Sequence, residues 1–233
     1  MLQHGWDVTP VEAKRIQEEL RRELVLEPPP GFAPRLAGGA DMSFERFATR
    51  GYAGVVVLDT ESMETVAEGA AEAELAFPYV PGFLSFRELP PIMAVWERLE
   101  RKPDVLVFDG QGTAHPRRFG VACHGGLLLG VPSIGCAKSL LVGTHGPLGE
   151  ERGSTAALVH RGETVGMAVR TRTGVKPVYV SPGHRMDLDT AVEIVLRLAS
   201  RFREPETTRR SHRLVNDMRR RAGEERAKLP PNP

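Results

Sequence analysis

The fold of this chain is decided by the stretch DVLVFDGQGTAHPRRFGVACHGGLLLGVPSIGCA, residues 104–137. Residues 104–109 are largely apolar between two acids, which predicts a buried strand. Residues 119–129 have the composition of a helix, and residues 133–137 predict a second short strand. Because strands that alternate with helices pair in parallel, the stretch predicts a parallel βαβ unit.

Three strand candidates precede this unit. They cover residues 36–44, 54–59 and 65–77, and short links join them. Consecutive strands with short links form an antiparallel meander. A three-strand meander followed by βαβ is the strand order of a ribonuclease-H-like fold, so we expect an α/β protein whose mixed sheet is flanked by helices. A fold does not by itself give a function.

Local signals place the first two helices. Thr9, Pro10 and Glu12 have the spacing of a capping box with proline at the first helical position, which predicts a helix start. An apolar stripe predicts another helix that begins near Pro90, with Glu88 at or just before its first turn.

The last part of the chain reads as strands followed by helices. A turn at Arg161 and Gly162 joins two strand candidates, residues 156–160 and 164–170, and residues 176–180 form a third. Thr190 and Glu193 are spaced as a capping box, which predicts a helix over residues 190–202. From residue 204 we expect one exposed, arginine-rich helix and then a disordered tail from about residue 222. Its arginines either track a phosphate backbone or only keep the surface solvated.

Composition limits the class of protein. With 233 residues, of which 41% are hydrophobic, the chain matches one globular domain over residues 1–233. A net charge of only +1 means that any contact with nucleic acid comes from local patches. Cys123 and Cys136 lack the spacing of a zinc site, so we predict reduced, structural thiols and a cytoplasmic location. Signal and membrane-spanning patterns are missing from the sequence, and we expect no membrane partner.

Three acids stand among apolar residues: Asp41 in the first strand, Glu88 near a helix start, and Asp109 at the end of a buried strand. Ligands bind at the carboxyl ends of parallel strands. Acids gathered there repel one another unless a cation neutralises them, and hard oxygen ligands select magnesium or manganese. Phosphoryl transfer uses such an arrangement. The alternative is that each acid only caps its element.

The segment DGQGTAHPRRFG is neither a dinucleotide fingerprint nor a Walker A loop. It predicts a tight turn followed by His115, Arg117 and Arg118 as phosphate contacts, or as residues that only order the turn or face solvent. Lys138, at the end of a strand, offers a point charge for a phosphate, or is merely solvated. Tyr79 in PYVPGF is either a rigidly held aromatic wedge or a core anchor.

Four segments together, PYVPGFLSFRE, VLVFDGQGTAHPRRFGVACHGG, VPSIGCAK and PVYVSPGH, resemble the endonuclease V family, the deoxyinosine 3' endonucleases of base-deamination repair. The resemblance runs from about Leu36 to His212. It implies that Asp41, Glu88 and Asp109 coordinate magnesium. It also implies roles for residues around them: Lys138 near the scissile phosphate, Tyr79 as the strand-separating wedge, Gly82, Leu84, Gly110 and Val121 around the displaced base, and His115 and His212 in support of the metal site.

Two positions depart from the family pattern. Ser139 stands where a second lysine is common, and Cys136 replaces a small aliphatic residue. The first difference would weaken contact with a phosphate, whereas the metal acids are unaffected.

The resemblance predicts a monomeric, magnesium-dependent enzyme, with manganese as the alternative ion. It would hydrolyse a phosphodiester one nucleotide to the 3' side of deoxyinosine in DNA, leaving 3'-hydroxyl and 5'-phosphate ends. Two alternatives stay open. One is an endonuclease that acts on inosine in RNA, since no motif reports contact with the 2'-hydroxyl. The other is a non-catalytic module that senses the lesion.

Overall fold

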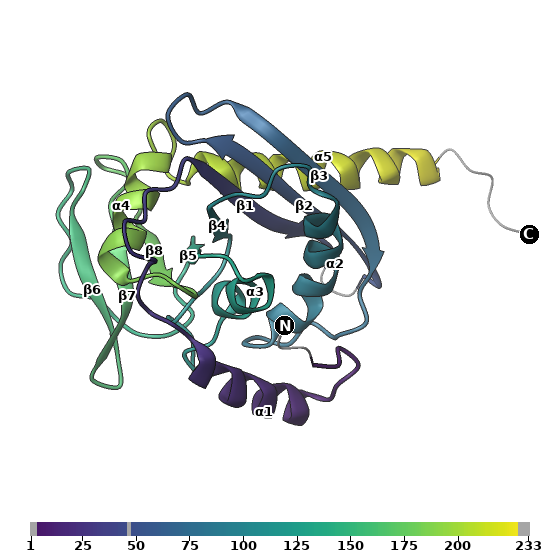
Figure 1. The fold of residues 1–233 in the computed structure, drawn as a ribbon, viewed down its shortest axis with the longest axis horizontal. Coiled ribbons are helices and arrows are strands. Elements are labelled where there is room, and N and C mark those ends of the chain that lie inside the picture. The colour runs from purple at the N-terminus through teal and green to yellow at the C-terminus, as the bar shows by residue number, and fades with distance from the viewer. Residues whose placement is uncertain (1–3, 46–47, 228–233) are drawn as a thin grey trace, which may run out of the picture.

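A computed structural model describes residues 4–45 and 48–227, and an eight-stranded mixed sheet lies at its centre (Figure 1). The strands follow the order β3-β2-β1-β4-β5-β8-β7-β6 across the sheet. Their bounds are β1 Leu36–Ser43, β2 Arg50–Asp59, β3 Thr65–Glu74, β4 Val105–Phe108, β5 Ser133–Ala137, β6 Thr155–His160, β7 Glu163–Val169 and β8 Val178–Pro182.

The predicted strand order is confirmed. Strands β1, β2 and β3 form an antiparallel meander, while β4 pairs in parallel with β1, and β5 in parallel with β4. Strands β8, β7 and β6 extend the sheet with antiparallel pairs. The turn between β6 and β7 lies at Arg161 and Gly162 as expected, and both residues have positive φ, 57° and 80°. Such a turn matches the twist of a hairpin.

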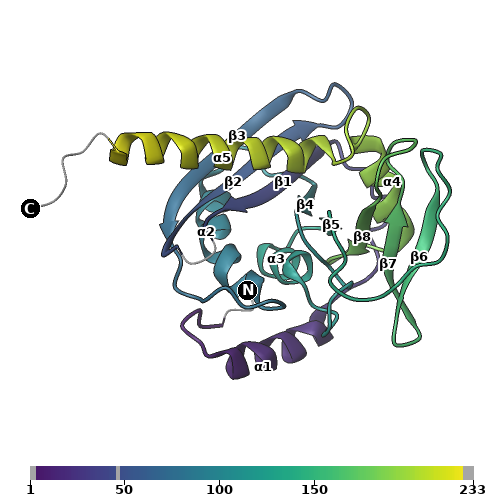
Figure 2. The same ribbon diagram turned by 180° about the vertical axis from the view of Figure 1, so that it is seen from behind.

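Helices cover both faces of the sheet. Helices α2 (Leu84–Arg98) and α3 (Val121–Leu129) pack on one face, in a core shared with β1, β2 and β4. Helices α4 (Leu188–Leu198) and α5 (Glu206–Ala227) lie on the other face, as the two opposite views show (Figures 1 and 2). Helix α1 (Pro10–Leu20), followed by a short 3-10 turn at Arg21–Glu23, packs outside α2 and α3.

Helix α2 corrects one prediction. It begins at Leu84 and not near Pro90, so Pro90 and Pro91 lie inside the helix and Glu88 lies in its second turn. Proline normally breaks a helix because it lacks the N–H donor and crowds the preceding turn. Here Leu89 and Ile92, which flank the prolines, are buried against the sheet, and this packing outweighs the local cost.

The N-terminal half of α5 is not exposed as predicted. Its residues Thr207, Thr208 and Ser211 are buried against β1 and β2. The close approach depends on glycine: a Cβ at Gly39 would lie 2.2 Å from the backbone of Thr207. The far half of α5 projects beyond the sheet and stays helical to Ala227, so only residues 228–233 of the expected tail remain, and they lie outside the described residues (Figure 2).

Helix α4 begins two residues earlier than predicted. Its N-cap is Asp187, whose side chain accepts from the Thr190 amide, so Thr190 lies inside the helix. Asp and Thr both cap helices, and only one of two adjacent signals can be used. At the other end of the chain, the capping box of Thr9 and Glu12 is confirmed.

Both cysteines, Cys123 and Cys136, are buried and free, as predicted. The extent of a single domain over residues 1–233 stays a prediction. Within the described part of the chain, no helix is both long and apolar enough to cross a membrane.

Candidate active site

Asp41 and Asp109 come together because their strands are neighbours. Ala40 of β1 pairs with Phe108 of the parallel strand β4, and each acid is the next residue along its chain. The amide of Asp109 donates to the carbonyl of Ala40 at 3.4 Å. Both side chains are largely buried, with 10% and 17% exposure. Parallel pairing therefore brings the two predicted acids to one edge of the sheet.

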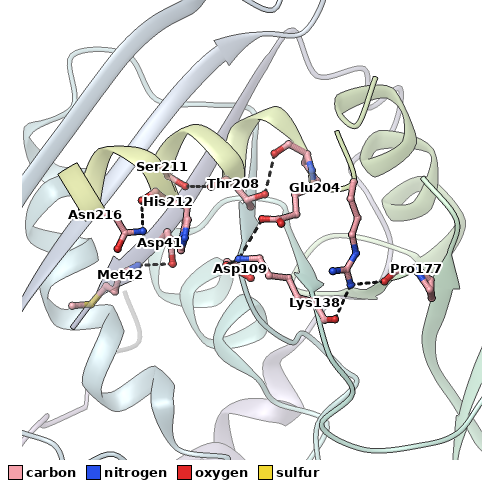
Figure 3. A network of polar contacts seen from close by, with 12 residues as sticks. Asp41, Met42, Asp109, Lys138, Pro177, Glu204, Thr208, Ser211, His212 and Asn216 are labelled. Atoms are coloured by element: carbon pink, nitrogen blue, oxygen red, sulfur yellow. Dashed lines mark hydrogen bonds and ion pairs between the residues drawn. The ribbon is translucent and has the colours of Figure 1, made fainter. Parts of the chain in front are cut away.

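His212 of α5 lies against this pair. Its Nδ1 is 2.7 Å from Oδ2 of Asp41, and the amide of Met42 donates to Oδ1 of the same carboxylate (Figure 3). The hydrogen bond to Asp41 raises the pKa of His212, so the imidazole favours its protonated form there. Potential ligand atoms of Asp41, Asp109 and His212 all lie within 4.8 Å of one another.

Lys138 and Glu204 extend the cluster. Lys138 Nζ lies 2.5 Å from Oδ2 of Asp109 and 3.2 Å from Oε2 of Glu204 (Figure 3). Burial lowers the pKa of Lys138, but attraction by Asp109 and Glu204 outweighs that effect and the pKa is raised overall. The lysine is thus a fixed positive charge between two carboxylates.

Glu88 approaches the cluster from α2. Burial, followed by the negative charges of Asp41 and Asp109, raises its pKa to about 8. The same two causes, burial and the charge of Asp41, raise the pKa of Asp109. The charge of Asp41 thus disfavours the ionised forms of both Glu88 and Asp109, as nearby like charges do. The oxygen-rich donor set and this concentration of negative charge both fit a hard divalent cation.

A pocket of about 380 Å³ opens beside the acids. Glu88, Asp109 and Lys138 form part of its wall. All six residues that the sequence suggested for substrate contact also line it, namely Tyr79, Gly82, Leu84, Gly110, His115 and Val121. Asp41 and His212 are not among its lining residues. The pocket and the acid cluster therefore adjoin each other and meet at Glu88 and Asp109.

Tyr79 is 37% exposed at the mouth of this pocket, and its ring lies edge-on to Phe44 at 6.3 Å. This exposure does not fit a core anchor.

Residues 18–213 of this chain match the family model of endonuclease V. The chain belongs to the endonuclease V family. It is 68% identical to endonuclease V of Myxococcus xanthus over 219 residues, which cover 94% of this chain and 93% of that protein. Endonuclease V is a DNA-repair nuclease that acts on phosphodiester bonds.

Solved endonuclease V structures have the same fold. The crystal structure from Streptomyces avermitilis has a TM-score of 0.89 and 43% identity, over 95% of this chain and 98% of that chain. Endonuclease V from Ciona intestinalis, solved with a 24mer DNA containing an inosine followed by a ribo-adenosine, has a TM-score of 0.79 and 27% identity. That comparison covers 91% of this chain and 98% of the Ciona chain.

The sequence predicts Arg117 and Arg118 either as phosphate contacts or as solvent-facing charge, and in the structure both make internal hydrogen bonds. Arg118 is buried and donates to Glu163 and to His160. Arg117 donates to the side chain of Gln17 and to the carbonyl of Gly82. Both guanidinium groups therefore stabilise the loop that carries them.

His115 is buried and neutral. Burial, followed by the charge of Arg117, lowers its pKa to about 4. Its Nε2 donates to the carbonyl of Gly82, and its Nδ1 accepts from the amide of Arg117. His115 lies in the pocket wall and is not among the three residues whose ligand atoms gather at the acid cluster.

Three residues of this site were not predicted from the sequence. Glu204 contacts Lys138, while Gln17 and Gln111 line the pocket. An acid next to Pro205 was a visible signal at Glu204, but nothing local says that it reaches Lys138. Gln17 is the one buried polar residue of an otherwise apolar helix face, and that signal was available in the spacing of α1.

Proposed function

We propose that this chain cleaves DNA one nucleotide to the 3' side of deoxyinosine, by hydrolysis that leaves 3'-hydroxyl and 5'-phosphate ends. The observation that carries the proposal is the meeting of an acid cluster and a base-sized pocket at Glu88 and Asp109. One site holds the charge needed for phosphodiester chemistry, and the other can accept a base taken out of the stack.

Asp41, Glu88 and Asp109 would hold magnesium, with manganese as the alternative ion. A divalent cation bound there supplies positive charge that offsets the phosphate and assists attack by water. His212 orients the carboxylate of Asp41 through its hydrogen bond at 2.7 Å. Lys138 places its ammonium group beside Asp109, where it can contact a phosphate oxygen.

The pocket would take up the hypoxanthine base. Gly82, Leu84, Gly110 and Val121 provide backbone groups and small apolar surfaces around it. Tyr79 is partly exposed and lies in a loop with prolines on either side. Its ring would insert between the two DNA strands as the base leaves the duplex.

Cleavage of inosine-containing RNA is the second candidate. It is supported by the Ciona relative, whose bound DNA carries a ribonucleotide directly after the inosine. A 2'-hydroxyl at that position is thus compatible with binding by that relative, and we extend the compatibility to this chain.

We also propose that the protein acts as a monomer in the cytoplasm. Two buried thiols that are not paired fit a reducing compartment.

The decisive experiment uses an end-labelled duplex with one deoxyinosine, an undamaged duplex, and the matching inosine-containing RNA, each with and without Mg²⁺. We expect a Mg²⁺-dependent nick just past the lesion in DNA. Asp41→Ala, Glu88→Ala and Asp109→Ala should each abolish nicking while largely preserving binding. Full activity in any of the three would refute the assignment of the acids. Cleavage of RNA alone would favour the second candidate, and binding without cleavage would favour a lesion sensor.

A further inference from the structure

The carbonyl oxygen of Gly82 accepts three hydrogen bonds. Gln17 Nε2 donates at 3.1 Å, Arg117 Nη2 at 2.6 Å and His115 Nε2 at 3.0 Å. A backbone carbonyl has two lone pairs, so this oxygen is fully engaged. Gly82 lies in the pocket wall and has φ of +81°, a conformation that most residues avoid. Three donors from two distant segments therefore fix an unusual backbone turn at the edge of the pocket.

Gln17 is the centre of this arrangement. It belongs to α1, its side chain lies in the pocket wall, and it is only 1% exposed. Its Nε2 also donates to the carbonyl of Phe119 at 3.3 Å, and its Oε1 accepts from Arg117 Nε at 2.5 Å. A buried amide costs free energy unless it is hydrogen-bonded, and here both ends of the amide have partners. Gln17 thereby ties α1 to two separate walls of the pocket.

Arg117 reinforces the same wall. Its guanidinium group lies 4.1 Å from the ring centre of Phe83, the residue after Gly82. A Cβ added at Gly82 would lie 3.1 Å from Arg117 Nη2 and 3.5 Å from His115 Nε2, so the donors leave little room for the loop to move. Arg117 thus contacts both Gly82 and its neighbour.

We propose that Gln17 is a positioning residue for base capture. Gln17 and Arg117 together hold Gly82 in the binding conformation before DNA arrives. The neighbouring pocket wall, which continues to Leu84, is held in place with it. Pre-organised contacts raise affinity because less freedom is lost on binding. This inference rests on the proposed function, and it assigns to α1 a part in substrate recognition although the helix lies outside the sheet layers.

The test compares Gln17→Met and Arg117→Met with wild type in nicking of deoxyinosine DNA, both duplex and single-stranded. Since a hydrogen bond between uncharged groups contributes about 1 kcal/mol, we expect KM to rise about fivefold for Gln17→Met on both substrates. Turnover should stay within about twofold, because the acids are untouched. The double variant should raise KM no more than the stronger single variant, since both act on one carbonyl. Glu19→Gln, on the exposed face of α1, is the matched control.

Hydrogen exchange supplies a second reading that does not need cleavage. Gln17→Met should speed exchange at the amides of Phe83 and Phe86, which bond within the same wall, while amides of the central strands stay as protected as in wild type. Unchanged KM and unchanged exchange in both variants would overturn the inference. A lower kcat with unchanged KM would also overturn it. If wild type fails to nick deoxyinosine DNA, the proposed function is wrong. The exchange result still tests whether Gln17 and Arg117 hold Gly82 in place. Should Gln17→Met not fold, Arg117→Met, at a partly exposed position, carries the same test.

Discussion

His212 Nδ1 lies 2.7 Å from Oδ2 of Asp41, although 171 positions separate the two residues along the chain. Helix α5 brings them together by packing directly on β1 at Gly39. The second oxygen of the carboxylate accepts from the amide of Met42. Asp41 is thus held at both oxygens, and its orientation depends on α5.

Removing the imidazole should therefore weaken the metal site without removing a carboxylate. We expect His212→Phe to lower activity or apparent Mg²⁺ affinity by about 10- to 100-fold, the usual effect of losing a partner that orients a ligand. Activity measured over a Mg²⁺ titration checks this expectation. His145→Phe changes a histidine outside the site and serves as control. Equal Mg²⁺ curves for His212→Phe and wild type would show that Asp41 needs no orienting partner.

Tyr79 should matter for duplex more than for single strands. An aromatic ring that stacks on a base contributes about 1–3 kcal/mol, so Tyr79→Ala should raise KM for duplex deoxyinosine DNA at least about fivefold. Tyr79→Phe, which keeps the ring, should behave like wild type. Steady-state nicking of duplex and single-stranded substrates checks both variants. Equal losses on the two substrates would argue against a wedge.

Glu204 should tune metal binding through Lys138. Among the described residues, Glu204→Gln leaves Asp109 as the one ion-pair partner of the ammonium group, which then competes more strongly with the cation for that carboxylate. Partly exposed ion pairs contribute at most about 1 kcal/mol, so we expect the Mg²⁺ requirement to rise by up to about fivefold. Calorimetric Mg²⁺ titration of the DNA-free protein, with exposed Glu150→Gln as control, provides the measurement. Tighter Mg²⁺ binding by the variant would contradict this account.

His115 should make the fold sensitive to acid. Its pKa is about 4 in the folded protein and about 6.5 when unfolded, so the folded state excludes a proton that the unfolded state takes up. The contribution is fully present above pH 6.5 and is lost as the pH falls toward 4. By pH 5 about 2 kcal/mol of this contribution has been lost relative to pH 7. Urea unfolding at pH 7 and pH 5 should show a smaller drop in His115→Gln than in wild type. Parallel drops would indicate that His115 is protonated in the fold.

Much of the fold was predictable because its signals are local. The apolar run before Asp109 and the helix after it predict a parallel unit, which the structure shows as β4, α3 and β5. The start of α2 was not predictable, since it depends on burial of Leu89 and Ile92, which outweighs two prolines. Local rules describe single segments, whereas packing between segments decided this one.

The site divides in the same way. Asp41 and Asp109 were found because an acid within a buried strand is unusual by itself. The buried half of α5 was missed because its position depends on Gly39, a residue of another element, and Glu204 was missed because its partner Lys138 is 66 positions away in the sequence. A glycine in a strand does not indicate in the sequence which helix will pack against it. Close contacts that depend on glycine cannot be predicted from the pattern of apolar and polar side chains.

The docking of α5 on Gly39 has a consequence for synthesis of the protein. Asp41 is made early and His212 near the end, and the helix that joins them is the last described element of the chain. A chain still emerging from the ribosome holds its acids without their histidine partner. The same is true of a chain cut short before α5. An unfinished copy therefore lacks the hydrogen bond that orients Asp41, even though every residue that lines the pocket has already been made.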